Sequence, residues 1–170
     1  MIQFKLKAPL QSWGLEKIRG GDYFPTDTKP TKSGVIGLIA CVMGLERGNP
    51  KINELGNTLD VYVRTCANEG IMTDFHVITA SKERPQYLAD GTNTKEEATS
   101  GIVTYRSYIQ GGDFDVIVDG PEDLLEEIVS AFNNPYWVPY LGRKSCSVSE
   151  PILPVKVDGV GNEFQRVDFR

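Results

Sequence analysis

The amino-acid sequence predicts an α+β fold, and three observations point to it. Apolar residues recur at helical spacing in residues 30–47 and again after Pro121, whereas apolar and polar residues alternate in several segments around them. Glycines, prolines and asparagines separate these segments. Hydrophobic residues make up 40% of the chain and charged residues 24%, as in ordinary soluble globular proteins. A length of 170 residues fits one domain, or one domain with an appendage.

The first predicted element is a strand over residues 2–7, in which apolar residues alternate with polar ones, Lys5 among them. Such a strand has one apolar face and one basic face. Pro9 is expected to end the strand, residues 11–14 to form a turn, and residues 15–31 to form a loop.

Residues 30–47 predict the helix around which the fold is organised. Its apolar residues form one buried stripe, and Thr31 or Ser33 can cap the free N–H groups at its start. A second stripe of small residues, including two glycines, suggests that another element approaches closely. Free N–H groups, hydroxyls and Lys32 together are suited to binding a phosphate. The alternative, a helix that only builds the core, is more common for such a pattern.

The remaining elements follow from the same two patterns. We expect a short helix over 52–59, strands over 60–67 and 73–80, a hairpin with strands over 102–110 and 114–119, a helix opened by Pro121 and ended by 133–135, and a closing strand near 152–157. The Gly-Gly-Asp sequence at 111–113 is a strong hairpin signal. The polar residues 81–101 are too long for an ordinary loop, so they are either functional or disordered.

This order of strands and helices is that of a ferredoxin-like α+β sandwich. One face of such a sheet carries the helices, and the other stays open. Open sheet faces with basic and aromatic residues are familiar RNA-binding surfaces.

The net charge of −5 argues mildly against a nucleic-acid binder that acts alone. Its distribution weakens that argument, because residues 1–47 hold 7 basic against 4 acidic side chains. Residues 48–101 hold 5 against 8, and residues 102–170 hold 6 against 11. This uneven distribution of charge along the chain suits a subunit with one anionic partner and several protein partners. Three widely spaced cysteines and the lack of any long apolar run predict a cytoplasmic protein without membrane contact.

His76 is the single histidine and the natural candidate for acid–base chemistry near neutral pH. It could act as a general base with Tyr105 or Lys82 as helper, although a lone histidine in a strand is more often structural. No second histidine and no group of cysteines and acids stands at ligand spacing around it, so we expect no metal site.

Residues 142–145 suit contact with a phosphate backbone. Gly142 lets the main chain approach a ligand, Arg143 and Lys144 supply positive charge, and Ser145 supplies a hydrogen bond. An ordinary basic turn explains the same four residues equally well.

These segments occur together, in order, in one protein family. The chain resembles the type I-E members of the CRISPR-associated Cas-five group within the RAMP superfamily. The resemblance rests on five motifs spread over residues 1 to about 155: PLQSWG (9–14), PTKSGVIGL (30–38), TDFHVI (73–78), TYRSYIQGGDFDVIV (104–118) and PYLGRKSC (139–146).

The resemblance implies a ferredoxin-like, RRM-type domain over residues 1–155, with a β-hairpin thumb at about 81–101 and a short C-terminal tail over 156–170. It implies a non-catalytic subunit of the Cascade surveillance complex that caps the 5′ handle of CRISPR RNA in antiviral defence. The implied neighbours are the backbone subunit and the large subunit, with target DNA met indirectly. No cofactor is implied. The residues expected to contact RNA are Lys5, Gln11, Trp13, Thr31, Lys32, Ser33, Arg106, Gly142, Arg143, Lys144 and Ser145.

Two other functions stay open at this point. One is a metal-independent endoribonuclease that processes repeat RNA, as in the type I-C branch, with His76 as the starting point. The other is a protein scaffold without RNA contact. The type I-E resemblance favours no catalytic residue in this chain.

Overall fold

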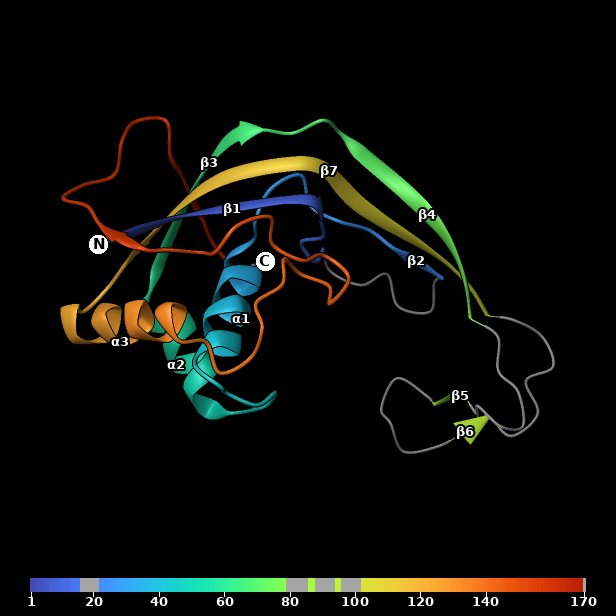
Figure 1. Ribbon diagram of the computed structural model, residues 1–170, viewed down its shortest axis with the longest axis horizontal. Helices are drawn as coiled ribbons and strands as arrows, with labels where there is room; N and C mark the ends of the chain where they lie inside the picture. Colours follow the sequence, from blue (N-terminus) through green and yellow to red (C-terminus); the bar gives the residue numbers. More distant parts are fainter. Residues whose placement is uncertain (16–21, 79–85, 88–93, 96–101, 170) are drawn as a thin grey trace.

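A curved β-sheet with helices against one face makes up the body of the protein in the computed structural model (Figure 1). The structure describes residues 1–15, 22–78, 86–87, 94–95 and 102–169. In these residues the main sheet has seven strands, in the order β8-β1-β7-β3-β9, with β2 and β4 also paired to β7. All its pairings are antiparallel except that of β2 with β7. The predicted mixture of helices with an antiparallel sheet is therefore confirmed.

The elements are β1 (Ile2–Gln11), β2 (Tyr23–Phe24), α1 (Lys32–Val42), α2 (Pro50–Thr58), β3 (Asp60–Ala67), β4 (Ile71–Ile78), β5 (Gln86–Tyr87), β6 (Thr94–Lys95), β7 (Ile102–Asp119), α3 (Glu122–Asn133), β8 (Val155–Lys156) and β9 (Gln165–Val167). Among these residues no helix is long and apolar enough to cross a membrane.

Alternation along β1 separates the core from the open face of the sheet. The even-numbered residues of 2–8 are buried, and burying one large apolar side chain contributes about 1.5–3 kcal/mol. The strand continues to Gln11, so the expectation that Pro9 ends it is wrong. The Lys7 carbonyl accepts a hydrogen bond from the Ser149 N–H, on the side away from β7. Pro9 faces that same side, so its missing N–H leaves the β1–β7 ladder intact.

The strand β7 passes through the predicted hairpin without reversing. Residues 102–119 form one strand, so the predicted turn at 111–113 is wrong. β1 pairs along this segment, with Ala8 opposite Gly112, and keeps the ladder continuous. Gly111 has a φ of 56°, a conformation that favours glycine, and the strand curves strongly through its middle (Figure 1). On its other side, β7 pairs with β4 before this bend and with β3 after it.

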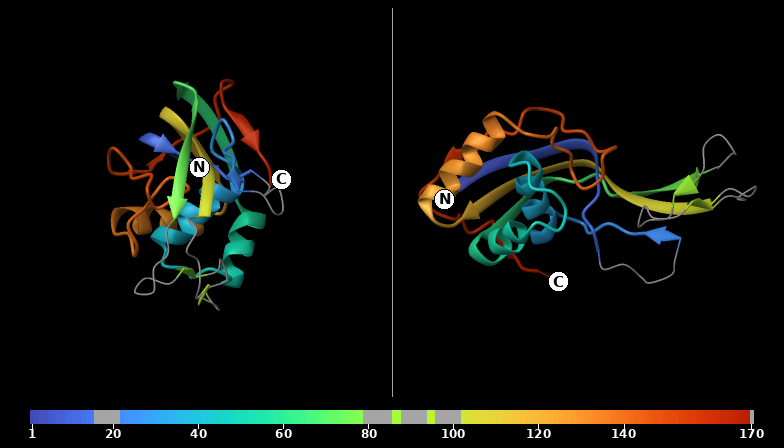
Figure 2. Two further views of the ribbon diagram at one scale, coloured as in Figure 1. Left: turned by 90° about the vertical axis from the view of Figure 1, so that its right-hand side faces the viewer. Right: turned by 90° about the horizontal axis from the view of Figure 1, so that it is seen from below.

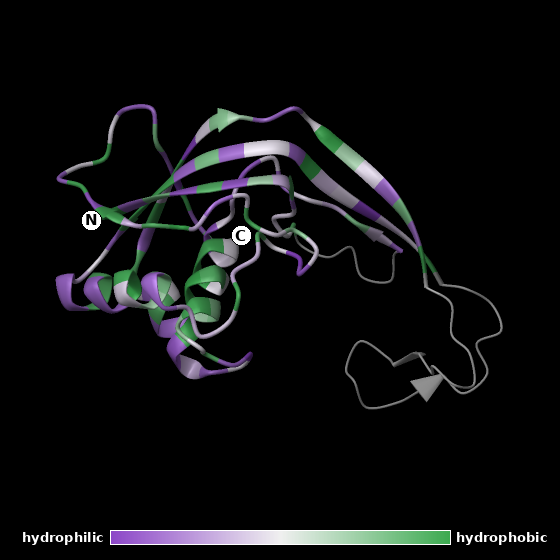
Figure 3. Ribbon diagram, in the orientation of Figure 1, coloured by the Kyte–Doolittle hydropathy of each residue, from purple (hydrophilic) through white to green (hydrophobic). Residues whose placement is uncertain are grey.

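The helix α1 packs its apolar stripe against the sheet and is mostly hydrophobic along its length (Figure 3). Thr31 caps it, as expected, by accepting a hydrogen bond from the Gly34 N–H at 3.2 Å. It ends at Val42, earlier than predicted, because Gly44 adopts a φ of 73°. A Cβ on Gly44 would lie 2.6 Å from Cγ of Tyr136, which is the close approach that the small residues predict.

The other helices and central strands lie near their predicted places. α2 begins at Pro50, with Asn49 as its cap, and α3 buries Leu125, Ile128 and Phe132. β3 matches the prediction, whereas β4 begins two residues earlier than expected, and the last two residues of the predicted strand, 79–80, lie outside the described part of the chain.

The C-terminal segment supplies strands at both edges of the sheet. β8 is shorter than the predicted strand at 152–157 and pairs with β1, so the expected boundary at residue 155 falls at its start. β9 has no counterpart in the sequence-based prediction and pairs with β3.

Three strands extend away from the body and form a feature that we call the arm: residues 22–24, 71–78 and 102–110 (Figure 2). β4 pairs with the first half of β7, and β2, within the expected loop at 15–31, pairs with β7 in parallel. Most of residues 81–101, the expected thumb, lie outside the described part of the chain. Within them, β5 and β6 pair with each other.

Candidate nucleic-acid interface

Gln11 and Trp13 lie inside the protein, where they position the start of α1. Both side chains are fully buried, and the Trp13 indole N–H donates a hydrogen bond to Gln11 Oε1 at 3.0 Å. The Gln11 amide donates to the carbonyls of Leu6 and Gly112 at 3.1 and 2.7 Å. A Cβ on Gly34 would lie 2.6 Å from the Trp13 ring, so this ring packs directly on the first turn of the helix. In this arrangement neither side chain presents a surface to a ligand.

Gly142 joins two of the sequence motifs through their main chains. Its φ is 91°, and a Cβ at this position would lie 1.5 Å from the Ser12 carbonyl oxygen. The Ser12 N–H donates to the Leu141 carbonyl at 3.1 Å. Only glycine fits so close to another backbone, and the turn is therefore fixed against the segment that follows β1.

Arg143 fastens this turn to the arm. Its guanidinium donates hydrogen bonds to the carbonyls of Ser107 and Phe24, at 3.1 and 2.9 Å, and lies 4.6 Å from the centroid of the Tyr108 ring. Lys144 and Ser145, which follow it, are exposed. The four residues of the predicted basic turn thus divide into two that position and two that are free to contact a partner.

The start of α1 does not gather all the groups that the sequence suggests. Ser33 is exposed, and Thr31 is occupied as the helix cap. Lys32 is buried, with its ammonium 3.9 Å from a carboxylate oxygen of Asp60 and 5.0 Å from the centroid of the Phe169 ring. The Lys32 ammonium therefore lies toward Asp60 and the C-terminal segment, away from Ser33.

The open face of the sheet carries a balanced network of charges. Lys5 lies 3.0 Å from Asp113 and 3.6 Å from Asp115. The hydrogen bond to Asp113 is the main reason that the pKa of Lys5 is raised. Arg64 donates two hydrogen bonds to Asp115 and one to Glu163. Because acids neutralise the cations here, this face is not the basic surface that the alternation in residues 2–7 predicts.

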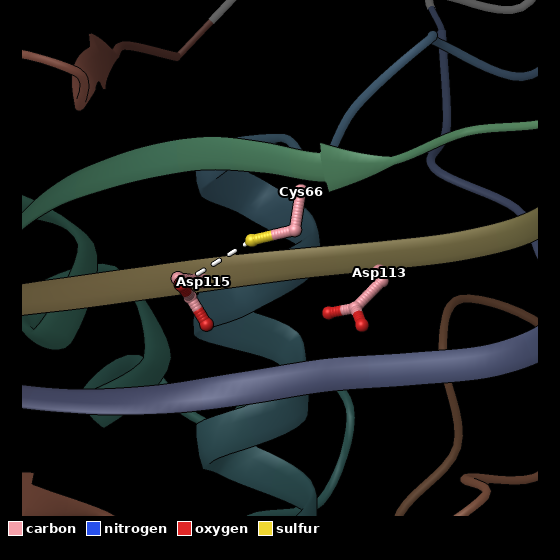
Figure 4. A group of neighbouring side chains, drawn as sticks. All are labelled: Cys66, Asp113 and Asp115. Carbon is pink, nitrogen blue, oxygen red and sulfur yellow. Dashed lines mark hydrogen bonds between the residues drawn. The ribbon is translucent and has the colours of Figure 1, made fainter.

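Cys66, Asp113 and Asp115 hold ligand atoms within 4.8 Å of one another and are the one possible metal-binding group among the described residues (Figure 4). Lys5 already contacts both carboxylates and Arg64 contacts that of Asp115, so the local charge is compensated without an ion. Burial, followed by the hydrogen bond that its thiol donates to Asp115, raises the pKa of Cys66. A neutral thiol is a poor metal ligand. The residues fit an ion-pair network better than a metal site.

Arg106 and His76 lie on the same face of the arm. Arg106 donates from Nε to the Thr104 hydroxyl at 3.2 Å and lies 5.8 Å from the centroid of the Phe24 ring. His76 Nδ1 lies 3.7 Å from Asp74, as the strand alternation suggests. His76 pairs in register with Thr104, so Tyr105 stands on the opposite face and the idea that it helps His76 is wrong. Lys82 lies outside the described residues.

The sequence-based prediction missed three aromatic residues of the arm: Tyr23, Phe75 and Tyr105. They are 45%, 57% and 45% exposed, respectively, although large aromatic side chains are usually buried. The alternation of Phe75 with His76 and of Tyr105 with Arg106 was visible in the sequence. That both rings stand on one face depends on the register of β4 with β7, which the predicted hairpin concealed.

Comparison with known proteins identifies the family. A family model described as CRISPR-associated protein (Cas_Cas5) matches residues 1–167, and the chain therefore belongs to the CRISPR-associated Cas5 family. The CRISPR system Cascade subunit CasD of Escherichia coli (strain K12) is 29% identical over 157 residues, which cover 88% of this chain and 67% of CasD.

Two solved structures share the fold. A chain of a CRISPR RNA-guided surveillance complex is 33% identical, with a TM-score of 0.73 over 89% of this chain. A second, described as the crystal structure of a Cas protein, is 28% identical, with a TM-score of 0.63 over 95% of this chain. The chain spans 61% and 65% of the length of these two proteins.

Proposed function

We propose that this protein is a non-catalytic, RNA-binding subunit of a type I-E Cascade complex, in which it binds and caps the 5′ handle of CRISPR RNA. The observation that carries this proposal is the likeness to a chain of an RNA-guided surveillance complex, at 33% identity and a TM-score of 0.73. The similarity to CasD supports the same assignment. Its partners would be CRISPR RNA, the backbone subunit and the large subunit, with target DNA reached through the complex, in the cytoplasm.

The strand order supports a ferredoxin-like, RRM-type core. Within a β-α-β-β-α-β unit, β1, β3, β7 and β8 are the first to fourth strands, and their order in the sheet is β8-β1-β7-β3. α1 and α2 connect the first strand to the second, and α3 connects the third to the fourth. In this proposal the arm corresponds to the base of the thumb, and residues 81–101 would complete it.

The geometry divides the proposed RNA-binding residues into two groups. Gln11, Trp13, Gly142 and Arg143 hold the segment after β1, the basic turn and the arm in fixed positions. The side chains that remain accessible, without an ion pair to any described residue, are Ser33, Lys144, Ser145 and, in part, Arg106, whereas Lys5 is exposed but paired with Asp113. We therefore assign contact with RNA to the second group and positioning to the first.

The test is assembly of the complex with and without this subunit. The remaining Cascade subunits are expressed with a CRISPR array, and the bound RNA is digested with a single-strand nuclease and sequenced at its 5′ ends. With the subunit present, the handle should be protected as one uniform 5′ end. Equal protection of the handle in complexes that lack the subunit would contradict the proposal.

A further inference from the structure

Three aromatic side chains form a row across the arm. In the register of the sheet, Tyr105 of β7 stands between Tyr23 of β2 and Phe75 of β4. Neighbouring strands lie about 4.8 Å apart, and side chains in register stand on one face. The rings of Phe75 and Tyr105 are in contact, with their centroids 5.6 Å apart and their planes at 68°. We call these three residues the aromatic row.

The aromatic row is exposed and held in place. Each of its rings is 45% or more exposed. The Ser107 hydroxyl lies 2.9 Å from the Tyr23 hydroxyl and 3.0 Å from the Thr73 hydroxyl, so it connects all three strands beside the row. The Tyr105 N–H donates to the Asp22 carbonyl at 2.7 Å and fixes the start of β2 against β7. A contiguous exposed aromatic surface on a fixed scaffold indicates a binding site.

The charges around the arm favour a polyanion as its partner. Cations in the body of the protein, such as Lys5, Arg64 and Arg166, form ion pairs with carboxylates. By contrast, within the described part of the chain, Arg106 and Arg143 form no ion pair, and both are bound to the arm through neutral oxygens. Arg106 stands on the face of the arm opposite the aromatic row, where its positive charge is available to phosphates of a strand that passes around the arm. The Arg143 guanidinium is held by the two carbonyls and adds positive charge to the base of the arm. A ligand that needs both aromatic faces and cations is single-stranded nucleic acid.

We propose that the aromatic row stacks against unpaired bases of the RNA, while Arg106, on the opposite face of the arm, attracts phosphates where the strand passes the edge of the arm. This inference rests on the proposed function and deepens it, because it assigns base contact to residues that no RNA-contact prediction included. Stacking on aromatic side chains of neighbouring strands is how RRM sheets hold two or three bases, and it tolerates any base sequence. The arm would therefore fix the path of the handle without reading its sequence.

The experiment places the fluorescent base 2-aminopurine in the handle of a guide RNA and assembles the complex with wild-type or variant subunit. Stacking quenches this fluorophore. Tyr105→Leu and Phe75→Leu remove a ring, whereas Tyr105→Phe keeps it. The matched control is Tyr136→Leu, which removes an aromatic side chain that is 71% exposed beside α1. Circular dichroism melts verify that each variant is folded.

The leucine variants should lose the quenching and bind the handle roughly 10-fold more weakly or worse. Tyr105→Phe and Tyr136→Leu should resemble the wild type. If the leucine variants keep both quenching and affinity, the inference is wrong while the proposed function stands. If they lose subunit assembly but keep quenching, the aromatic row binds protein and the inference is wrong. If the wild-type subunit leaves the handle unbound, the proposed function fails as well.

Ultraviolet crosslinking of the wild-type complex gives a test that needs no variant. Peptides crosslinked to the handle are identified by mass spectrometry. Crosslinks at Tyr23, Phe75 or Tyr105 support the inference. Crosslinks confined to residues outside the arm overturn it.

Discussion

The side chain of Asp115 joins three strands on the open face of the sheet. Its carboxylate accepts hydrogen bonds from Arg64 and from the Cys66 thiol, and it lies 3.6 Å from Lys5. Burial opposes ionisation of this group, but the Arg64 guanidinium, the thiol and Lys5 together outweigh burial, so the pKa of Asp115 lies below its ordinary value. The carboxylate thereby links strands β1, β3 and β7 side by side.

A pKa that is lower in the folded protein makes stability depend on pH. The contribution of Asp115 is fully present above the pKa of an unfolded aspartate, about 3.9, and disappears as the pH falls through the lower folded value. Asp115→Asn should therefore lower the free energy of unfolding at pH 7 by about 1–2 kcal/mol, because Arg64 and Lys5 are partly solvated. Below the folded pKa the difference should vanish.

Urea denaturation at pH 7 and at acid pH measures this difference. Glu127→Gln, which breaks the exposed pair with Lys51, is the matched control and should change stability little at either pH. A loss that is the same at both pH values would show that the effect of Asp115→Asn does not come from its ionisation.

At the scale of elements, local sequence patterns were enough to predict an element wherever its own residue types determine its ends and its buried face. The cap and buried stripe of α1, the limits of β3 and the start of α3 all follow from residue types within the element. The path of β7 does not, because Gly111 and Gly112 form a sequence typical of a hairpin. The path of β7 depends on β1, which lies some hundred residues earlier and pairs with β7 on both sides of these glycines.

In the candidate site, too, some features follow from local sequence and others depend on distant residues. Gly142 and Arg143 were predicted to contact a phosphate backbone, but in this structure they contact the protein main chain elsewhere in the sequence, which no local pattern shows. Lys32 follows the helix cap in sequence, but a C-terminal aromatic ring draws its ammonium away. The exposed aromatic row could be recognised only once three strands were aligned.

The strand β9 gives a prediction at this scale, because its three residues cover the edge of β3. Val167 pairs with Val61 and is 9% exposed, whereas Val155 of β8 is 58% exposed. Val167→Ala should lower the free energy of unfolding by about 1–2 kcal/mol, since it removes apolar surface from the core. Val155→Ala should change it by less than about 0.5 kcal/mol. Denaturant titration of both variants measures the contrast, and equal losses would show that β9 is not part of the folded edge.

At the scale of the whole molecule, the net charge of −5 is compatible with RNA binding because the charges are segregated. Many acids of the described body, such as Asp113, Asp115 and Glu122, form ion pairs with neighbouring cations, while the arginines at the arm have no carboxylate partner among the described residues. A polyanion would therefore meet a locally positive surface on an acidic protein.

We predict that this protein does not cleave RNA. Metal-free cleavage needs a base and an acid held on either side of the scissile phosphate. His76 and Asp74 are each nearly half exposed and lie 3.7 Å apart, and Tyr105 is on the opposite face of the arm. Purified protein should leave repeat RNA intact over pH 6–8 in the presence of a chelator, and His76→Ala should leave the activity of the complex unchanged. Cleavage at the handle boundary that His76→Ala abolishes would establish the endoribonuclease instead.

The position of β1 between β8 and β7 in the sheet has a consequence for the synthesis of the protein. β1 leaves the ribosome before its two neighbours, β7 and β8, which begin about 100 and 150 residues later. At a synthesis rate of roughly 5–20 residues per second, the apolar face of β1 lacks its partner β7 for about 5–20 s. Throughout that interval both edges of β1 lack strand partners, so this sheet cannot form strand by strand in chain order. Chaperones that shield short apolar segments during translation would act on residues 2–8 first.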